Sequence, residues 1–308
     1  MCDLNKYKGI IPAFYACYDE KGEVSPERVR ELTGYFVKKG VKGVYVNGSS
    51  GECIYQSVEE RKIIIENVMA EAKGKLTVIN HVACNNTRDS VELARHSQEV
   101  GADAIASIPP IYFHLPEYSI AGYWNAISDA APELDFVIYN IPQLAGTALT
   151  MSLFHEMLKN PRVVAVKNSS MPTQDIQMFK ADGIAARGEF LVFNGPDEQF
   201  VAGRAIGADG GIGGTYGVMP DLFLKLNELV IAGQREEAMK LQYAINAIIY
   251  KMCSGKGNMY AVAKEILRIN EDLDLGGVRE PLENLHENDF AVAGEAAEMI
   301  REAREEYL

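Results

Sequence analysis

Short runs of apolar and β-branched residues recur along the chain, and segments with the apolar spacing of amphipathic helices lie between them. The runs are about 28 residues apart, which is the length that one strand, one crossover helix and two loops require. Because consecutive positions in each run are apolar, we expect strands buried on both faces, as in a parallel sheet covered by helices. The pattern predicts an α/β fold, a (β/α)8 TIM barrel, with strands at residues 9–14, 43–46, 76–82, 102–108, 136–139, 163–167, 190–193 and 210–212.

Two of the intervening segments carry signals for a helix start. Ser25 precedes Pro26, which is the order of an N-cap and a first helical residue. Ser57 and Glu60 have the spacing of a capping box. These signals support helices after the first and second strands.

Beyond residue 220 the strand pattern stops and only helical patterns remain. They cover residues 221–232, 235–252, 259–267 and 291–307. The breaks at 254–257 and 272–281 are rich in turn residues but too short to be flexible linkers. We therefore predict the barrel over residues 1–220 and a C-terminal helical extension over residues 221–308.

Composition narrows the class of protein. The chain has 308 residues, of which 47% are hydrophobic and 24% charged, as in a globular protein with a large core. A net charge of −13 argues against a nucleic-acid or anionic-membrane partner, because both require clustered Lys and Arg. The start of the chain lacks the apolar core of a signal peptide, so we expect a cytoplasmic protein. The cysteines are scattered and form no Cys-x-x-Cys pair, so we expect reduced thiols at Cys2, Cys17, Cys53, Cys84 and Cys253.

In such a barrel, the residues at the carboxyl ends of the strands face the active site. After the second strand, residues 47–52 read NGSSGE and place Ser49 and Ser50 on a glycine-bracketed turn. Hydroxyls and backbone N–H groups of such a turn can bind a carboxylate. The alternative is an ordinary Gly/Ser turn with a serine that caps the next helix.

The fifth strand ends at Tyr139 and the sixth at Lys167. Lysine is almost never buried without a role, and desolvation supplies the neutral amine that attacks a ketone. Lys167 is therefore a candidate nucleophile, unless its side chain extends out of the barrel end to solvent. Tyr139 is a candidate proton carrier or a core residue with a satisfied hydroxyl.

Adjacent carboxylates, Asp197 and Glu198, follow the seventh strand. They could bind sugar hydroxyls or cap the next helix, where negative charge is favoured. The glycine cluster at 210–214 lacks the spacing of a dinucleotide fingerprint, because Tyr216 stands where the third glycine is needed. The histidines have no metal-ligand spacing, and residues 48–52 are not a Gly-x-Ser-x-Gly elbow. We expect no metal and no cofactor.

Three motifs in this order, GSSGE at 48–52, YNIP at 139–142 and VK at 166–167, resemble the N-acetylneuraminate lyase and dihydrodipicolinate synthase family of Schiff-base barrel aldolases. The resemblance covers essentially the whole chain and implies a homotetramer built from dimers. It favours the lyase branch, because Leu144 lies in the segment where synthases usually carry an arginine for a second carboxylate. The GPDE segment at 195–198 is similar to the lyase motif that binds a polyhydroxyl chain.

The resemblance implies reversible cleavage of N-acetylneuraminate to pyruvate and N-acetylmannosamine. Lys167 would form the Schiff base, Tyr139 would move protons, and Ser49 and Ser50 would hold the substrate carboxylate. The groups expected to bind the sugar portion are Ser169, Gly195, Asp197, Glu198, Gly213 and Gly214.

A few positions depart from the family pattern. Gly214 stands where lyases often have a serine, Asn168 is atypical after the lysine, and Phe113 follows Tyr112 where synthases have a second tyrosine. Another keto-acid aldolase, of the 2-keto-3-deoxygluconate or dihydrodipicolinate type, stays open as an alternative. A catalytically silent relative that acts as a regulator or scaffold is the non-enzymatic alternative.

Overall fold

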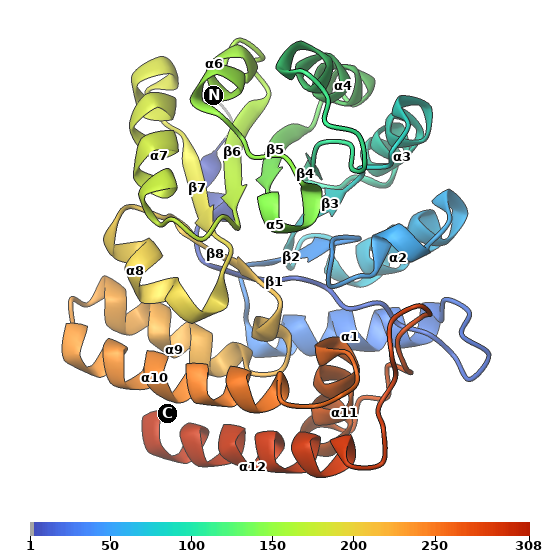
Figure 1. Ribbon diagram of the computed structural model, residues 1–308, viewed down its shortest axis with the longest axis vertical. Helices are drawn as coiled ribbons and strands as arrows, with labels where there is room; N and C mark the ends of the chain where they lie inside the picture. The colour runs from blue at the N-terminus through green and yellow to red at the C-terminus, as the bar shows by residue number, and fades with distance from the viewer. Residues whose placement is uncertain (1–2) are drawn as a thin grey trace.

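The computed structural model describes residues 3–308, and its strands form a parallel barrel surrounded by helices (Figure 1). The strands pair in the order β1-β8-β7-β6-β5-β4-β3-β2. A parallel bridge between Ala13 and Tyr45 closes the ring, and the Phe14 N–H donates to the Tyr45 carbonyl at 2.9 Å. The predicted barrel is confirmed, with strands at β1 Ile10–Pro12, β2 Gly43–Val46, β3 Thr77–His81, β4 Ala104–Ser107, β5 Asp135–Asn140, β6 Val163–Asn168, β7 Leu191–Asn194 and β8 Gly210–Gly213.

Helices between the strands cover the outside of the barrel. The Ser25 side chain accepts a hydrogen bond from the Arg28 N–H, and Ser57 and Glu60 form the predicted capping box. Both predicted helix starts are thus confirmed. The helices that follow β1 to β7 are α1 Pro26–Lys39, α2 Val58–Ala72, α3 Thr87–Val100, α4 Glu117–Ala130, α5 Pro142–Ala145, α6 Met151–Met157, α7 Gln174–Arg187 and α8 Phe200–Ala205.

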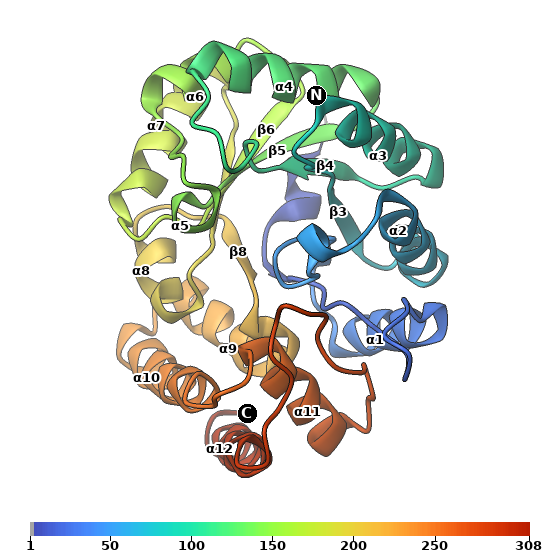
Figure 2. The same cartoon turned by 45° about the vertical axis from the view of Figure 1, so that its right-hand side comes forward.

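The last third of the chain packs onto the α1 side of the barrel, as Figure 2 shows. It contains α9 Pro220–Ile231, α10 Arg235–Met252, α11 Met259–Glu271 and α12 Asp289–Tyr307. Its apolar faces are continuous with the barrel core, because Val29 of α1, Leu226 of α9, Ile245 of α10 and Ile300 of α12 belong to one buried cluster. The division at residue 220 stays a prediction. The packing of α9 against β1 and α8 favours an extension that begins at α10.

Several strands run one residue further than their apolar pattern predicts. Asn140, Asn168 and Asn194 are register partners on neighbouring strands, and all are buried. The Asn140 side-chain amide donates to the Asn168 side-chain oxygen at 2.7 Å, so the strands can end in polar residues without leaving the core. The atypical Asn168 therefore has a structural role beside the predicted lysine.

Cys17, Cys53, Cys84 and Cys253 are free thiols, and Cys2 lies outside the described residues. Within residues 3–308, the helices are too short or too polar to cross a membrane.

Candidate active site

Lys167 and Tyr139 lie side by side at the carboxyl ends of β6 and β5, where they are register partners. Lys167 is only 4% exposed, so the alternative in which it extends to solvent is wrong. Its Nζ lies 4.0 Å from the centroid of the Tyr139 ring and 4.1 Å from that of Tyr45. The amine is therefore held between two aromatic rings inside the barrel mouth.

This environment changes the charge state of the amine. Burial lowers the pKa of Lys167 to about 7, and the nearby Asp197 carboxylate opposes that shift. An ordinary lysine is almost fully protonated at neutral pH, whereas here a large fraction is neutral. Lys167 can thus act as a nucleophile toward a carbonyl carbon near pH 7.

Tyr139 is buried beside the lysine and keeps its proton. Burial raises the pKa of Tyr139 to about 12, and hydrogen bonds with the Ser49 and Ser169 side chains act in the opposite direction. These contacts bring together residues from β5, the 47–52 turn and the segment after β6. Tyr139, Ser49 and Ser169 thus form one connected group next to Lys167.

The 47–52 turn has an unusual backbone. Asn47 and Glu52, at its two ends, have φ angles of 56° and 55°, in the left-handed region that non-glycine residues rarely adopt. The 3-10 helix Cys53–Tyr55 that follows has no side-chain cap, so the capping-serine alternative is wrong. Ser50 instead donates to the Tyr260 hydroxyl at 2.9 Å.

Asp197 is buried at the end of β7 and faces β8. Its Oδ2 accepts from the Thr215 N–H at 2.7 Å and from the Thr215 hydroxyl at 2.6 Å. Its Oδ1 is buried and has no hydrogen-bond partner within residues 3–308. Burial raises the pKa of Asp197 to about 7. A hydroxyl of a bound ligand could satisfy this free acceptor.

Neither carboxylate caps the helix that follows. Helix α8 begins after Gln199 without a side-chain cap, although both carboxylates lie in the first turn of the preceding 3-10 helix Asp197–Gln199, where negative charge is favoured. Glu198 is exposed, and its backbone carbonyl accepts from the Asn246 amide at 3.0 Å. The structure buries one carboxylate of the pair in the site and leaves the other at the surface.

The glycines of the candidate site allow close approach between its polar groups. A Cβ on Gly213 would lie 1.9 Å from Asp197 Oδ1, and one on Gly195 would lie 2.0 Å from the Ser169 hydroxyl. A Cβ on Gly214 would lie 3.2 Å from the Tyr260 hydroxyl and 3.3 Å from that of Ser50. A serine at 214 would crowd this pair, which gives the departure from the family pattern a physical reason.

Sequence patterns do not identify two tyrosines of the site. Tyr45 lies in the apolar run of β2, two residues before the 47–52 turn. Because side chains alternate between the two faces of a strand, the position of Tyr45 in β2 is the one signal that could identify it as facing the barrel interior. Tyr260 comes from α11, outside the barrel, and no local pattern distinguishes it. Tyr112 and Phe113 are at the surface, 88% and 71% exposed, and their rings contact each other.

Comparisons with known proteins identify the family of the chain. Residues 6–298 match the model of the Dihydrodipicolinate synthetase family. The chain is 70% identical to an N-acetylneuraminate lyase of Mediterraneibacter gnavus, with 100% of this chain and 97% of that protein covered. It is 34% identical to an N-acetylneuraminate lyase of Rhizobium meliloti, with 97% of each covered.

Solved structures of similar sequence also have the fold of this chain. The wild-type sialic acid aldolase of Ruminococcus gnavus superposes with a TM-score of 0.96 at 69% identity, over 98% of this chain and 100% of that one. The N-acetylneuraminate lyase of Fusobacterium nucleatum superposes with a TM-score of 0.85 at 28% identity, over 98% and 99% of the two chains.

Proposed function

The chain belongs to the dihydrodipicolinate synthetase family, and we propose that within it this enzyme cleaves N-acetylneuraminate reversibly to pyruvate and N-acetylmannosamine. The observation that carries the proposal is the buried Lys167, with its pKa lowered to about 7, beside Tyr139 at the barrel mouth. The full-length similarity to N-acetylneuraminate lyases favours this substrate over those of other keto-acid aldolases.

The reaction begins with the open-chain keto acid. Ser49 and Ser50 hold the carboxylate and present the neighbouring ketone carbon to Lys167. The neutral amine adds to that carbon, and loss of water from the carbinolamine gives a protonated imine. The bond between carbons 3 and 4 then breaks, and its electron pair moves toward the imine nitrogen to form an enamine.

Proton transfers complete the cycle. As the bond breaks, the carbon-4 hydroxyl loses its proton and becomes the aldehyde of N-acetylmannosamine. Protonation of the enamine at carbon 3 and hydrolysis of the imine release pyruvate and restore the amine. Tyr139 carries protons in these steps, because its ring centroid lies 4.0 Å from Lys167 Nζ and its hydroxyl interacts with the Ser49 and Ser169 side chains.

The sugar portion binds on the β7 and β8 side. Asp197 offers its free Oδ1 to a sugar hydroxyl, and Ser169 and Glu198 contribute further polar groups. Gly195, Gly213 and Gly214 keep the backbone near these side chains uncrowded. A hydrogen bond from a hydroxyl to a carboxylate contributes about 1.5–3 kcal/mol, enough to select a polyhydroxyl chain over a bare keto acid.

A comparison of three substrates tests the assignment. The purified protein should cleave N-acetylneuraminate much faster than 2-keto-3-deoxygluconate and should not condense pyruvate with aspartate semialdehyde. The exposed Leu144 side chain offers no cation for the second carboxylate that a synthase substrate carries. A higher rate with either rival substrate would contradict the lyase assignment and leave the aldolase class in place.

We also propose that the protein is a cytoplasmic homotetramer. Its free thiols suit a reducing compartment, and the exposed pair Tyr112 and Phe113 suits a surface covered by another subunit. Tyr112 has a φ of 84°, a strained geometry that a subunit contact could hold. Light scattering should give four times the chain mass of 33.9 kDa, and a monomer mass would contradict the assembly.

A further inference from the structure

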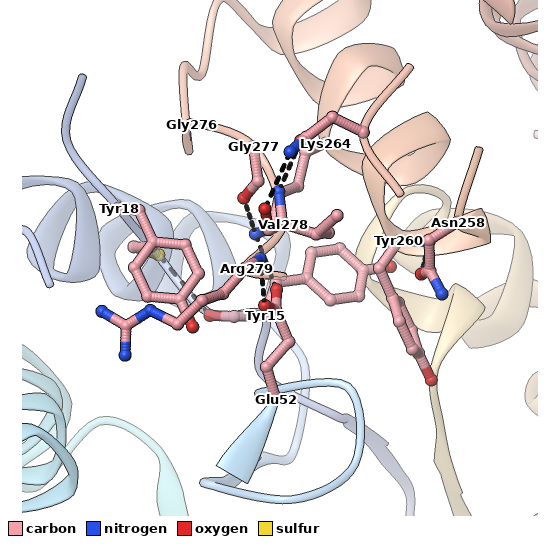
Figure 3. A network of polar contacts seen from close by, with 12 residues as sticks. Tyr15, Tyr18, Glu52, Asn258, Tyr260, Lys264, Gly276, Gly277, Val278 and Arg279 are labelled. Carbon is pink, nitrogen blue, oxygen red and sulfur yellow. Dashed lines mark hydrogen bonds and ion pairs between the residues drawn. The ribbon is translucent and has the colours of Figure 1, made fainter. Parts of the chain in front are cut away.

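A buried ion pair joins the barrel mouth to the C-terminal helices, outside the groups that touch the substrate. Lys264 Nζ lies 3.0 Å from Glu52 Oε1, and the two side chains are 2% and 0% exposed (Figure 3). Glu52 Oε2 also accepts from the Arg279 N–H at 2.8 Å, and Lys264 also donates to the Gly277 carbonyl at 2.5 Å. Both charged groups are thus paired and further hydrogen-bonded.

The ion pair includes a residue of the 47–52 turn, which is the segment proposed to bind the carboxylate of the substrate. Glu52 is the last residue of the 47–52 turn, and Lys264 lies on α11. Tyr260 lies one helical turn before Lys264, so both side chains share one face of α11. Tyr260 contacts Ser50 and Lys264 contacts Glu52, so two positions of the helix meet two positions of the turn.

The turn needs such support because its conformation is costly. A non-glycine residue in the left-handed region is strained and persists only where its surroundings hold it. Glu52 is one such residue, with a φ of 55°. The ion pair binds its side chain from one side, and the Arg279 N–H binds it from another.

A gain in folding stability does not explain why Glu52 and Lys264 form a buried ion pair. The desolvation of two charges in a buried pair largely cancels their attraction, whereas removal of one partner is costly. A buried pair can instead select one arrangement of the elements that it joins. We propose that Glu52 and Lys264 are positioning residues that hold the Ser49–Ser50 turn in register with α11 and so shape the pocket for the keto-acid carboxylate.

This inference rests on the proposed function for the full substrate, but its test needs only pyruvate. The variants are Glu52→Gln, Lys264→Met and the double variant, which leaves no uncompensated charge. Borohydride trapping at increasing pyruvate gives the half-saturating concentration and the maximal trapping rate. We expect the half-saturating concentration to rise about tenfold, the equivalent of about 1.4 kcal/mol in binding. The maximal trapping rate should change by less than about threefold, because Lys167 keeps its surroundings.

The chain offers a matched control at the other end of the barrel. Lys180 Nζ lies 2.6 Å from Asp209 Oδ2, which also accepts from the Val192 N–H at 2.9 Å, and Lys180 also donates to the Phe190 carbonyl. This pair has the same hydrogen-bond pattern but lies at the amino ends of β7 and β8. The Lys180→Met/Asp209→Asn variant should leave the half-saturating concentration of pyruvate unchanged.

The reverse reaction separates positioning from general damage. With N-acetylmannosamine as the second substrate, the KM for pyruvate should rise in the Glu52 and Lys264 variants, while the KM for N-acetylmannosamine stays within about twofold. Equal increases in both KM values, or unchanged half-saturating pyruvate in a folded Glu52→Gln protein, would overturn the inference. Glu52→Gln keeps the side-chain shape and is decisive if Lys264→Met does not fold. The wild-type cleavage assay decides the proposed function separately.

Discussion

Lys167 derives its chemistry from where its side chain ends. Side chains along a barrel strand point alternately inward and outward. Lys167 on β6 points inward, and its amine lies between the rings of Tyr45 and Tyr139. Burial destabilises the ammonium more than the neutral amine and so lowers the pKa to about 7. The sequence indicates a buried lysine at this strand end, but it does not give the two rings that enclose it.

The lowered pKa predicts the pH dependence of imine formation with pyruvate. Below pH 7 the ammonium form dominates and cannot attack, so the initial rate should rise about tenfold per pH unit and level off above about pH 7. Tyr139, whose pKa is raised to about 12, stays protonated over this range. Borohydride quenching at early times between about pH 5 and pH 9 measures the rate. A rate that continues to rise beyond pH 9 would indicate an ordinary, solvated lysine.

Removal of the Tyr139 hydroxyl tests its role in proton transfer. Tyr139→Phe should keep the fold, because the ring packing is unchanged, and should lower turnover by about 10²–10⁴-fold, the range for a positioned acid–base group. Steady-state cleavage of N-acetylneuraminate measures the loss, and circular dichroism checks the fold. Near-normal turnover would mean that Tyr139 only packs and that another group moves the proton.

The two carboxylates after β7 should separate in their effects. At about pH 8, above its pKa of about 7, Asp197 is largely ionised, so Asp197→Asn removes a charge at the free Oδ1 and the KM for N-acetylneuraminate should rise by about tenfold or more, as for one charged hydrogen bond. Glu198→Gln, at the surface, is the matched control and should have a smaller effect. Both variants should form the pyruvate imine almost normally in borohydride trapping. Equal losses in cleavage and imine formation would mean that Asp197 supports the fold through Thr215 instead.

At the scale of elements, local patterns predict most of the barrel. Apolar runs locate the strands, and Ser25 and Ser57 locate helix starts, because these signals depend on near neighbours. The strand ends at Asn140 and Asn168 are not predictable in this way, since each asparagine becomes compatible with burial only through a partner on the next strand.

The contribution of α11 to the site is the clearest limit of sequence reasoning. Tyr260 meets Ser50, and Lys264 meets Glu52, although more than 200 residues separate the partners in the chain. Nothing near Tyr260 in the sequence indicates this contact. Only the packing of the extension onto the barrel creates it.

The whole molecule carries a net charge of −13, although its proposed substrate is an anion. Charges more than a Debye length of about 8 Å from the substrate are largely screened at physiological salt. We therefore expect the Ser49 and Ser50 hydroxyls, the backbone N–H groups of their turn and Lys167 to determine how tightly the substrate binds. The acidic surface affects the solubility of the protein and the long-range approach of the substrate, whereas the local groups of the site affect the binding affinity.

The active site is built around one reactive amine, and a covalent adduct on Lys167 is the strongest evidence for it. The protein is incubated with pyruvate and borohydride, digested, and mapped by peptide mass spectrometry, with Lys167→Ala and Lys264→Met as matched lysine variants. We predict a reduced pyruvate adduct on Lys167 in the wild-type protein and in Lys264→Met at saturating pyruvate, and none in Lys167→Ala. An adduct on another lysine, or no adduct in the wild-type protein, would contradict the account.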